Sequence, residues 1–168
     1  MSCISIVSFA VLINGSASPF FHVERGLRQG CPLSPLLFLL VAEGLSRAIQ
    51  EAKGRGLFKG LNIAPTLSLS HLLFVDDVLI FCSGSLRDSQ TLRDIVSLFS
   101  TMTAMEINAG KSSISTHLLD DAEVEALRAS FPFEHKPLDD GFKYLGFHLK
   151  ANGYTKTDWH WLLEKLSR

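Results

Sequence analysis

The sequence predicts an α+β fold in which helices pack on one face of a mostly antiparallel sheet. Hydrophobic residues make up 46% of the 168 residues and charged residues 20%, a composition typical of a folded globular domain. Apolar segments joined by short turn signals predict hairpins. Segments with apolar residues three and four positions apart predict amphipathic helices between them. The expected order is hairpin, helix, hairpin, helix, strand, helix, hairpin, helix.

The first hairpin is predicted from an apolar segment, Ser5–Asn14, which ends at the strong turn signal Asn14-Gly15. Pro19 ends the polar loop, and Phe20–Arg25 is the expected return strand. Because both segments carry apolar side chains, we expect them to pair in an antiparallel hairpin.

A long helix is expected next. Ser34 can cap its N-terminus, with Pro35 at the first helical position, where a missing N–H has no consequence. The helix should end near Ala52, before a Gly-rich segment. Its first two turns are apolar all round, which predicts burial, whereas Leu45 and Ile49 mark one buried face of its last turns.

Two strands, Leu67–Val75 and Val78–Cys82, are predicted from apolar residues interrupted only by Asp76-Asp77. The two aspartates would form the tight turn of a hairpin. Ser85 then opens a second helix, with Asp88 three residues later as its capping partner. Apolar residues at helical spacing follow as an amphipathic stripe: Leu92, Ile95, Val96, Phe99 and Met102.

The remaining elements are shorter. A strand is expected around Met105–Asn108, and a third helix that begins at Asp120 or Asp121. Phe142–Leu149 reads as a strand. An Asn152-Gly153 turn and a return strand at Tyr154-Thr155 are expected after it. Thr157 then caps a final helix, whose apolar residues are Trp159, Leu162, Leu163 and Leu166.

Charge and cysteine content limit the cellular context. The formal net charge is −1, so the whole chain has no strong attraction for nucleic acid. Residues 24–59 carry six basic side chains against three acidic ones, which fits a phosphate-facing side and a solvated surface equally well. Three widely spaced cysteines indicate neither a zinc site nor disulfides. With no secretion signal, and with an apolar run at Pro35–Ala42 too short for a membrane helix, we expect a nuclear or cytoplasmic protein without a membrane partner.

The adjacent acids Asp76 and Asp77 admit two interpretations. They can be ordinary residues of a solvent-exposed turn. Alternatively, the hairpin tip presents paired carboxylates to divalent cations, because like charges forced together persist most easily beside positive charge. Hard carboxylate oxygens suit Mg²⁺, which commonly binds one or two carboxylates and substrate phosphates.

Four segments occur in a family-like order: "GLRQGCPLSPLLFLLVAEGLSRAI", "HLLFVDDVLIF", "LFSTMTAMEINAGKS" and "FKYLGFHL". Together they closely resemble the reverse transcriptases of non-LTR (LINE-type) retrotransposons, especially those of plants. The resemblance extends from about Ile4 to the C-terminus. It implies a partial polymerase palm in residues 1–150 and the start of a thumb in residues 151–168.

The resemblance also implies roles for individual residues. Asp76 and Asp77 match the aromatic-x-Asp-Asp box, whose carboxylates hold Mg²⁺. Lys111 matches a lysine near the incoming deoxynucleoside triphosphate, where its charge would offset that of the leaving pyrophosphate. Two further motifs also match. The loop beside the nascent base pair would be formed by Arg28-Gln29-Gly30, and the hairpin that grips the primer end by Tyr144-Leu145-Gly146.

Each assignment has a structural alternative: Gln29 as a loop residue, Lys111 as a surface lysine and Tyr144 as an ordinary strand aromatic. His22 and His71 lack metal-ligand spacing and are expected to be structural.

The sequence also departs from the family pattern. The family's active site needs a third carboxylate in a phenylalanine–Asp box upstream of the glutamine loop, and no such box occurs here. The fingers are absent as well. We therefore expect a fragment of an RNA-directed DNA polymerase that binds Mg²⁺ weakly and does not extend a DNA primer on an RNA template. The alternative is a non-catalytic module that binds nucleic acid or protein, including self-association through an exposed sheet edge.

Overall fold

The structure is a computed structural model that describes residues 8–22, 30–151 and 153–167. The N-terminal arm is a ladder of four short strands: β1 (Ser8–Phe9) pairs with β4 (Phe21–His22), and β2 (Leu12–Ile13) with β3 (Ser16–Ala17). Both pairs are antiparallel, with Asn14 and Gly15 at positive φ in the turn. The predicted hairpin is confirmed there; its outer residues, 5–7 and 23–25, lie outside the described residues.

The long helix, α2, spans Leu33–Gly54. It begins slightly earlier than predicted, since Pro32, not Ser34, occupies the N-cap position, and the Pro32 side chain makes no capping hydrogen bond. Its C-terminus is closed by backbone hydrogen bonds, in which the N–H groups of Arg55 and Gly56 donate to Glu51 and Lys53.

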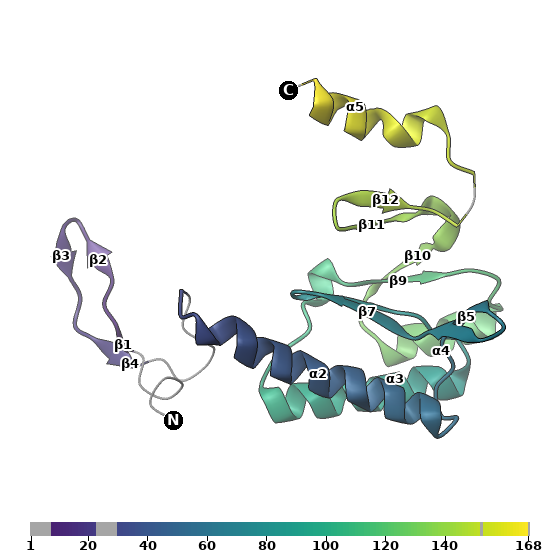
Figure 1. Cartoon of the computed structure of the whole chain (residues 1–168), viewed down its shortest axis with the longest axis horizontal. Coiled ribbons are helices and arrows are strands. Elements are labelled where there is room, and N and C mark those ends of the chain that lie inside the picture. Colours follow the sequence, from purple (N-terminus) through teal and green to yellow (C-terminus); the bar gives the residue numbers. More distant parts are fainter. Residues whose placement is uncertain (1–7, 23–29, 152, 168) are drawn as a thin grey trace.

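Burial along α2 confirms the expected buried face at Leu45 and Ile49 but contradicts the burial expected for the first two turns. Leu36 and Leu40 in the first turns are 58% and 71% exposed, whereas Leu45 and Ile49 in the later turns are 7% and 0% exposed. The expectation for the first turns was wrong because the described elements cover only the C-terminal half of the helix (Figure 1).

The core forms where α2 meets α3 (Leu86–Thr103). Its buried residues are Leu45, Ile49, Ala52 and Phe58, against which Leu92, Ile95 and Phe99 of α3 pack. The predicted stripe is therefore confirmed for these three residues. Ser85 caps α3 as predicted by accepting a hydrogen bond from the Asp88 N–H.

Four strands follow α2 in two antiparallel hairpins: β5 (Leu61–Ala64) with β6 (Leu67–Leu69), and β7 (His71–Phe74) with β8 (Asp77–Ile80). Strand β5 was not predicted, and the expected strand Leu67–Val75 is divided between β6 and β7. The break falls at Ser70, whose carbonyl accepts a hydrogen bond from the Phe81 N–H.

The next elements form a parallel crossover. β9 (Ser113–Thr116) pairs with β10 (Glu134–Pro137), and α4 (Asp121–Ser130) connects them. Asp120 caps α4 in a capping box with Glu123, as its position predicted. The strand expected at Met105–Asn108 is wrong, because this segment is irregular and leads into a 3₁₀ turn, η1 (Ala109–Lys111).

The C-terminal segment is another hairpin followed by helical turns. After η2 (Leu138–Asp140), β11 (Phe142–Tyr144) pairs with β12 (Phe147–Leu149), so the single strand predicted from the apolar pattern is a hairpin. The chain then forms η3 (Lys156–Trp159) and α5 (His160–Leu166). Thr155, not Thr157, is the capping residue, and no strand forms at Tyr154-Thr155.

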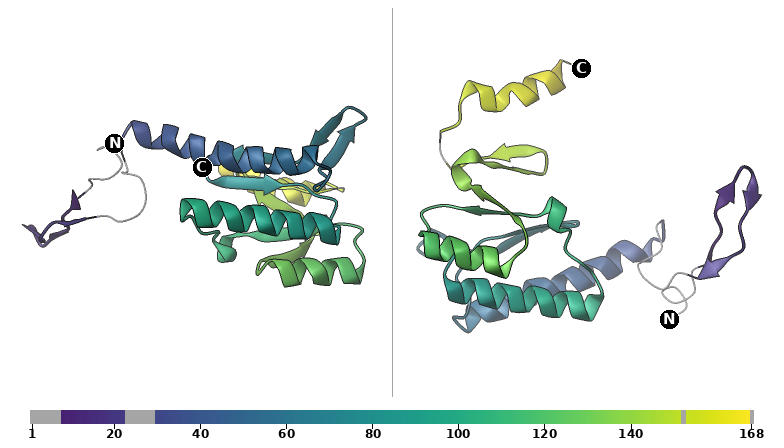
Figure 2. Two further views of the ribbon diagram at one scale, coloured as in Figure 1. Left: turned by 90° about the horizontal axis from the view of Figure 1, so that it is seen from below. Right: turned by 180° about the vertical axis from the view of Figure 1, so that it is seen from behind.

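The helices α2, α3 and α4 lie on one side of the strands β5–β9 (Figures 1 and 2). Across the described ranges the strands form two-stranded sheets, and all but β9–β10 are antiparallel. The predicted α+β class, with helices on one face of mostly antiparallel strands, is therefore confirmed.

By length and composition alone, α2 could cross a membrane: an 18-residue window has a mean hydropathy of 1.3, with 17% of it buried. The core helix of a soluble protein meets the same criterion, and the C-terminal half of α2 packs on α3.

Candidate functional site

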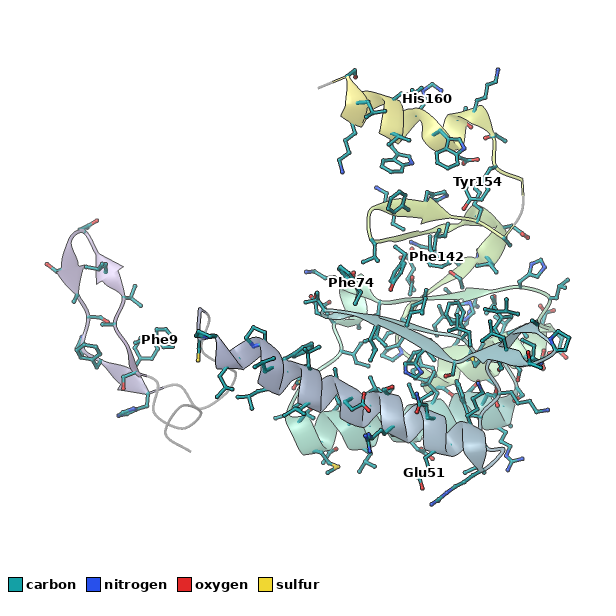
Figure 3. The ribbon with its side chains drawn as sticks, viewed as in Figure 1. Phe9, Glu51, Phe74, Phe142, Tyr154 and His160 are labelled. Atoms are coloured by element: carbon teal, nitrogen blue, oxygen red, sulfur yellow. The ribbon has the colours of Figure 1, made fainter. Side chains whose placement is uncertain are left out.

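The predicted site centres on the tip of the β7–β8 hairpin. Phe74 pairs with Asp77, so the two-residue turn consists of Val75 and Asp76. The turn had been predicted at Asp76-Asp77, one residue later than observed, because Asp77 is the first residue of β8. Both aspartates are exposed, and Figure 3 shows the neighbouring Phe74 at this tip.

The carboxylates of Asp76 and Asp77 make no hydrogen bond or ion pair with any residue that the structure describes. Each therefore has its oxygen lone pairs available to an external cation or to water. Within the same residues, no group of three His, Cys, Asp or Glu side chains is arranged to hold a metal ion.

The backbone at this tip is unusual. Val75 has φ +52°, although a β-branched side chain disfavours the left-handed region. A residue held in such a conformation costs on the order of 1–3 kcal/mol and persists only where its surroundings impose it. The hairpin register imposes it here, since Val75 is the first of only two residues that reverse the chain.

Lys111 is the last residue of η1 and is exposed. Its segment lies at the same end of the strands as the β7–β8 tip in the views of Figures 1 and 2. No hydrogen bond or ion pair joins Lys111 to either aspartate in the described part of the chain. The lysine and the carboxylates are therefore on a common side without direct pairing.

The remaining predicted site residues belong to the segment before α2 and to the β11–β12 hairpin. Gly30 precedes α2 with φ +82°, which glycine adopts without strain; Arg28 and Gln29 lie outside the described residues. Tyr144 is half-buried and pairs with Phe147, and Leu145 and Gly146 form a two-residue turn with both φ values positive. The tip of this hairpin points toward the same end of the molecule as the β7–β8 tip (Figure 1).

The chemistry of this tip is compatible with Mg²⁺. Two exposed carboxylates supply hard oxygen ligands, and Mg²⁺ commonly takes only one or two protein carboxylates, with water and phosphate oxygens completing its octahedron. Asp76 and Asp77 are the residues that would hold such an ion.

An open pocket of about 590 Å³ lies elsewhere, where the C-terminal end of α2 meets β6 and β7. His71 is held at its wall: Ser46 Oγ lies 2.8 Å from Nε2 and Ser70 Oγ 3.0 Å from Nδ1. These contacts agree with the structural role expected for His71, and His22 likewise bonds Ser8. Desolvation, and to a smaller extent the charge of Lys53, lowers the pKa of His71. The sequence analysis did not predict this pocket. The one related signal was the excess of basic side chains in residues 24–59, which include Lys53 of the pocket wall.

Comparison with known proteins agrees with the motifs. Residues 2–149 match the family "Reverse transcriptase (RNA-dependent DNA polymerase)". A retrovirus-related Pol polyprotein from the type-1 retrotransposable element R2 of Popillia japonica is 28% identical over 177 residues, covering 98% of this chain and 28% of that protein. A corresponding polyprotein from the type-2 element R2DM of Drosophila melanogaster is 25% identical over 83% of this chain and 13% of its own length. An uncharacterized mitochondrial protein of Arabidopsis thaliana is 42% identical over 39% of this chain.

The chain thus spans less than a third of the length of the Popillia japonica polyprotein. Its similarity is to retrotransposon R2 proteins and is distant. The family match covers most of the sequence, including the β7–β8 tip and both hairpins that carry the predicted site residues. This chain belongs to the reverse transcriptase (RNA-dependent DNA polymerase) family.

Proposed function

We propose that this chain is part of the palm of a non-LTR-type RNA-directed DNA polymerase. In this proposal Asp76 and Asp77 provide two carboxylates for the divalent metal of nucleotidyl transfer. RNA template, DNA primer and deoxynucleoside triphosphate are the partners of the intact enzyme, in the nucleus or the cytoplasm. Residues 1–150 belong to the palm, and residues 151–168 begin the thumb.

The observation that carries this proposal is the state of the two carboxylates. Both are exposed at a strained turn and have no protein partner among the described residues, so nothing there competes with a cation. An aspartate that merely stabilised a turn would be expected to bond nearby backbone N–H groups. A bound divalent ion would supply charge neutralisation at phosphate oxygens.

Metal binding is tested with Mn²⁺ as a paramagnetic substitute for Mg²⁺. Mn²⁺ should broaden the amide NMR signals of Val75, Asp76 and Asp77 first, with half-saturation at millimolar concentration or weaker. The substitution Asp76→Asn should remove this selectivity. Asp121→Asn is the matched control, because Asp121 is exposed on α4, away from this hairpin. Equal broadening in both variants would remove the metal site from the proposal.

We further propose that the 168-residue chain does not polymerise by itself. Asp76 is the first aspartate in the sequence, so no aspartate upstream of the Gly30 loop completes the metal ligands within this chain. A clamp for two metal ions stabilises both the attacking and the leaving oxygen, and two carboxylates on one turn fall short of the ligands this needs.

A primer-extension assay on an RNA template with the purified chain measures this directly. We expect no Mg²⁺-dependent cDNA above that of the Asp76→Asn variant, which also controls for contaminating polymerase. Robust synthesis by the wild-type chain that the variant lacks would refute the proposed inactivity and support the role of Asp76.

A second candidate function is a non-catalytic interaction module. The β7–β8 hairpin is a two-stranded sheet in the described part of the chain, so each strand has one edge without a strand partner. Phe74 and Val78 on this hairpin are 54% and 45% exposed. Such edges recruit further strands, from a second copy or another protein.

Light scattering across a concentration series distinguishes this candidate from the first. Strand pairing predicts a discrete dimer that Val78→Lys weakens, because a charge on the hairpin opposes edge pairing. The exposed Val11 on the N-terminal arm offers the control Val11→Lys. A monomer at all concentrations would exclude the self-associating form.

A further inference from the structure

The open pocket at the end of α2 has an unusual charge balance. Its lining consists of Gln50, Lys53, Gly54, Ser68, Leu69, Ser70 and His71, so it includes a cation and several hydrogen-bond donors but no carboxylate. Its volume of about 590 Å³ is within the range of small-ligand sites.

Lys53 carries the charge of this pocket. Its side chain is half-buried, and its ammonium donates one hydrogen bond, 2.6 Å long, to the Ser68 carbonyl. The nearest acids on α2 are already paired: Glu43 with Arg47 at 2.9 Å and Glu51 with Arg55 at 2.5 Å. Lys53 therefore has no carboxylate partner among the described residues, and two of its three N–H groups remain available.

His71 adds a titratable group to the same wall. With both ring nitrogens bonded to serine hydroxyls and its pKa lowered by desolvation and by Lys53, the imidazole is neutral at pH 7. Glu43 opposes this effect only weakly. Hydroxyl groups can accept hydrogen bonds from an imidazolium, so protonation in acid would add a second positive charge without breaking either contact.

The C-terminal end of α2 does not cancel this positive character. Exposed carbonyls at a helix C-terminus repel anions. Here the carbonyls of Glu51, Ala52 and Lys53 accept hydrogen bonds from the N–H groups of Arg55, Leu57 and Gly56. These carbonyls are therefore satisfied within the chain.

We propose that this pocket binds a phosphate group, with Lys53 supplying the charge and Gln50 a hydrogen bond from its exposed amide. A lysine binds phosphate as a point charge and needs no fixed fork geometry. The site is separate from the Asp76–Asp77 tip, because His71 and Phe74 are opposite ends of β7. The phosphate can belong to a free nucleotide or to a nucleic-acid backbone.

The test uses inorganic phosphate as its probe. The His71 imidazole signals are followed by NMR during phosphate titration at pH 6.0 and pH 7.5, with chloride keeping the ionic strength constant. We expect a saturable shift, tighter at pH 6.0, and an upward movement of the His71 pKa with phosphate. Lys53→Met should weaken binding about tenfold or more, since a charged hydrogen bond is lost. Lys59→Met is the matched control, because Lys59 is exposed and does not line the pocket.

A second variant separates binding from folding. Lys53→Met also removes the hydrogen bond to Ser68. The side chain of Gln50, in contrast, is exposed and makes no hydrogen bond with the described residues. Gln50→Leu should therefore weaken phosphate binding without lowering stability. A nucleoside monophosphate and an oligonucleotide with hydroxyl ends then distinguish a terminal phosphate from a backbone phosphate. Shifts that do not saturate, or that are unchanged in Lys53→Met, would overturn the proposal and leave Lys53 as a structural tie to β6.

Discussion

Phe74 and Asp77 face each other as the last cross-strand pair of the β7–β8 hairpin, and only Val75 and Asp76 lie between them. The two aspartates are therefore not equivalent. Asp77 has the fixed backbone of a paired strand residue, whereas the position of Asp76 depends on a turn that strains Val75. A change in the turn should thus affect Asp76 more than Asp77.

Replacing Val75 with glycine should stabilise the chain by about 1 kcal/mol, since glycine adopts positive φ without strain while the exposed valine loses little burial. Val78→Gly is the matched control. Val78 is a strand residue of the same hairpin, so its substitution should destabilise by about 1 kcal/mol. Urea unfolding midpoints measure both changes. Destabilisation of similar size in both variants would mean that the φ of Val75 carries no strain.

The turn also illustrates what local sequence signals can predict. Hairpins and amphipathic helices were predictable because their signals lie within a few residues, as with Ser85 and the stripe from Leu92 to Phe99. The parallel pairing of β9 with β10 joins Ser113 to Glu134 across a helix, and no local period encodes it. The one-residue error at Asp76-Asp77 has a related cause: aspartate is the more typical turn residue, yet the register places Val75 in the turn.

The candidate sites, too, were predictable only where their signal is local in the sequence. The carboxylate pair was identifiable because adjacent acids interrupt an apolar segment. The pocket of Lys53 and His71 was not, because it forms only when the end of α2 packs beside the junction of β6 and β7. The early turns of α2 were expected to be buried from their composition alone, and composition does not specify what covers a surface.

Asp88 is predicted to be the most sensitive polar residue of the core. The residue is 2% exposed, and its carboxylate accepts hydrogen bonds from the Ser83 hydroxyl at 2.7 Å, the Ser83 N–H at 3.0 Å and the Lys59 N–H at 3.2 Å. It thereby connects α3 to the segment before β5 and to the one after β8. Asp88→Ala leaves these donors without a partner and should reduce the free energy of unfolding by about 2–4 kcal/mol.

Asp94→Ala provides the control for Asp88, because Asp94 is an exposed residue of the same helix. Its substitution should change stability by less than about 0.5 kcal/mol. A loss below 1 kcal/mol for Asp88→Ala would show that water replaces the carboxylate at these donors.

Stability should decrease as the pH falls below about 6.5. His71 and His135 both have a lowered pKa from desolvation, and the charge of Arg128 contributes at His135, whose buried Nε2 has no hydrogen-bond partner among the described residues. A histidine whose folded pKa is below its ordinary value of 6.5 binds its proton more readily after unfolding. Its contribution is therefore complete above pH 6.5 and is lost as the pH falls toward the folded pKa.

Urea unfolding at pH 7.5, 6.5 and 5.5 measures this linkage, with up to about two protons taken up on unfolding. The double variant His71→Asn/His135→Asn should show a flatter pH dependence. His160→Asn, at an exposed position on α5, should retain the wild-type slope. An identical slope in all three proteins would assign the acid sensitivity to other groups.

The joint between the β11–β12 hairpin and α5 should depend on the ion pair of Lys150 and Asp158. The two side chains are 20% and 11% exposed, and their charged atoms lie 2.9 Å apart. Hydrogen bonds from Thr155, followed by the interaction with Lys150, hold the pKa of Asp158 well below its usual range. The pair should therefore remain intact at pH 5 and be lost only in stronger acid, when the carboxylate is protonated.

Both tryptophans of the chain lie at this joint: Trp161 meets Phe147 edge to face at 5.8 Å, and Trp159 lies 5.7 Å from Tyr154, which is labelled in Figure 3. Tryptophan fluorescence therefore reports on this joint alone. Lys150→Met should increase acrylamide quenching and shift the emission to longer wavelength, because the aromatic contacts loosen while the α2–α3 core is unaffected. Lys143→Met, at an exposed strand position, should match the wild type. If the quenching and emission of Lys150→Met also equal those of the wild type, the aromatic contacts hold this joint without the ion pair.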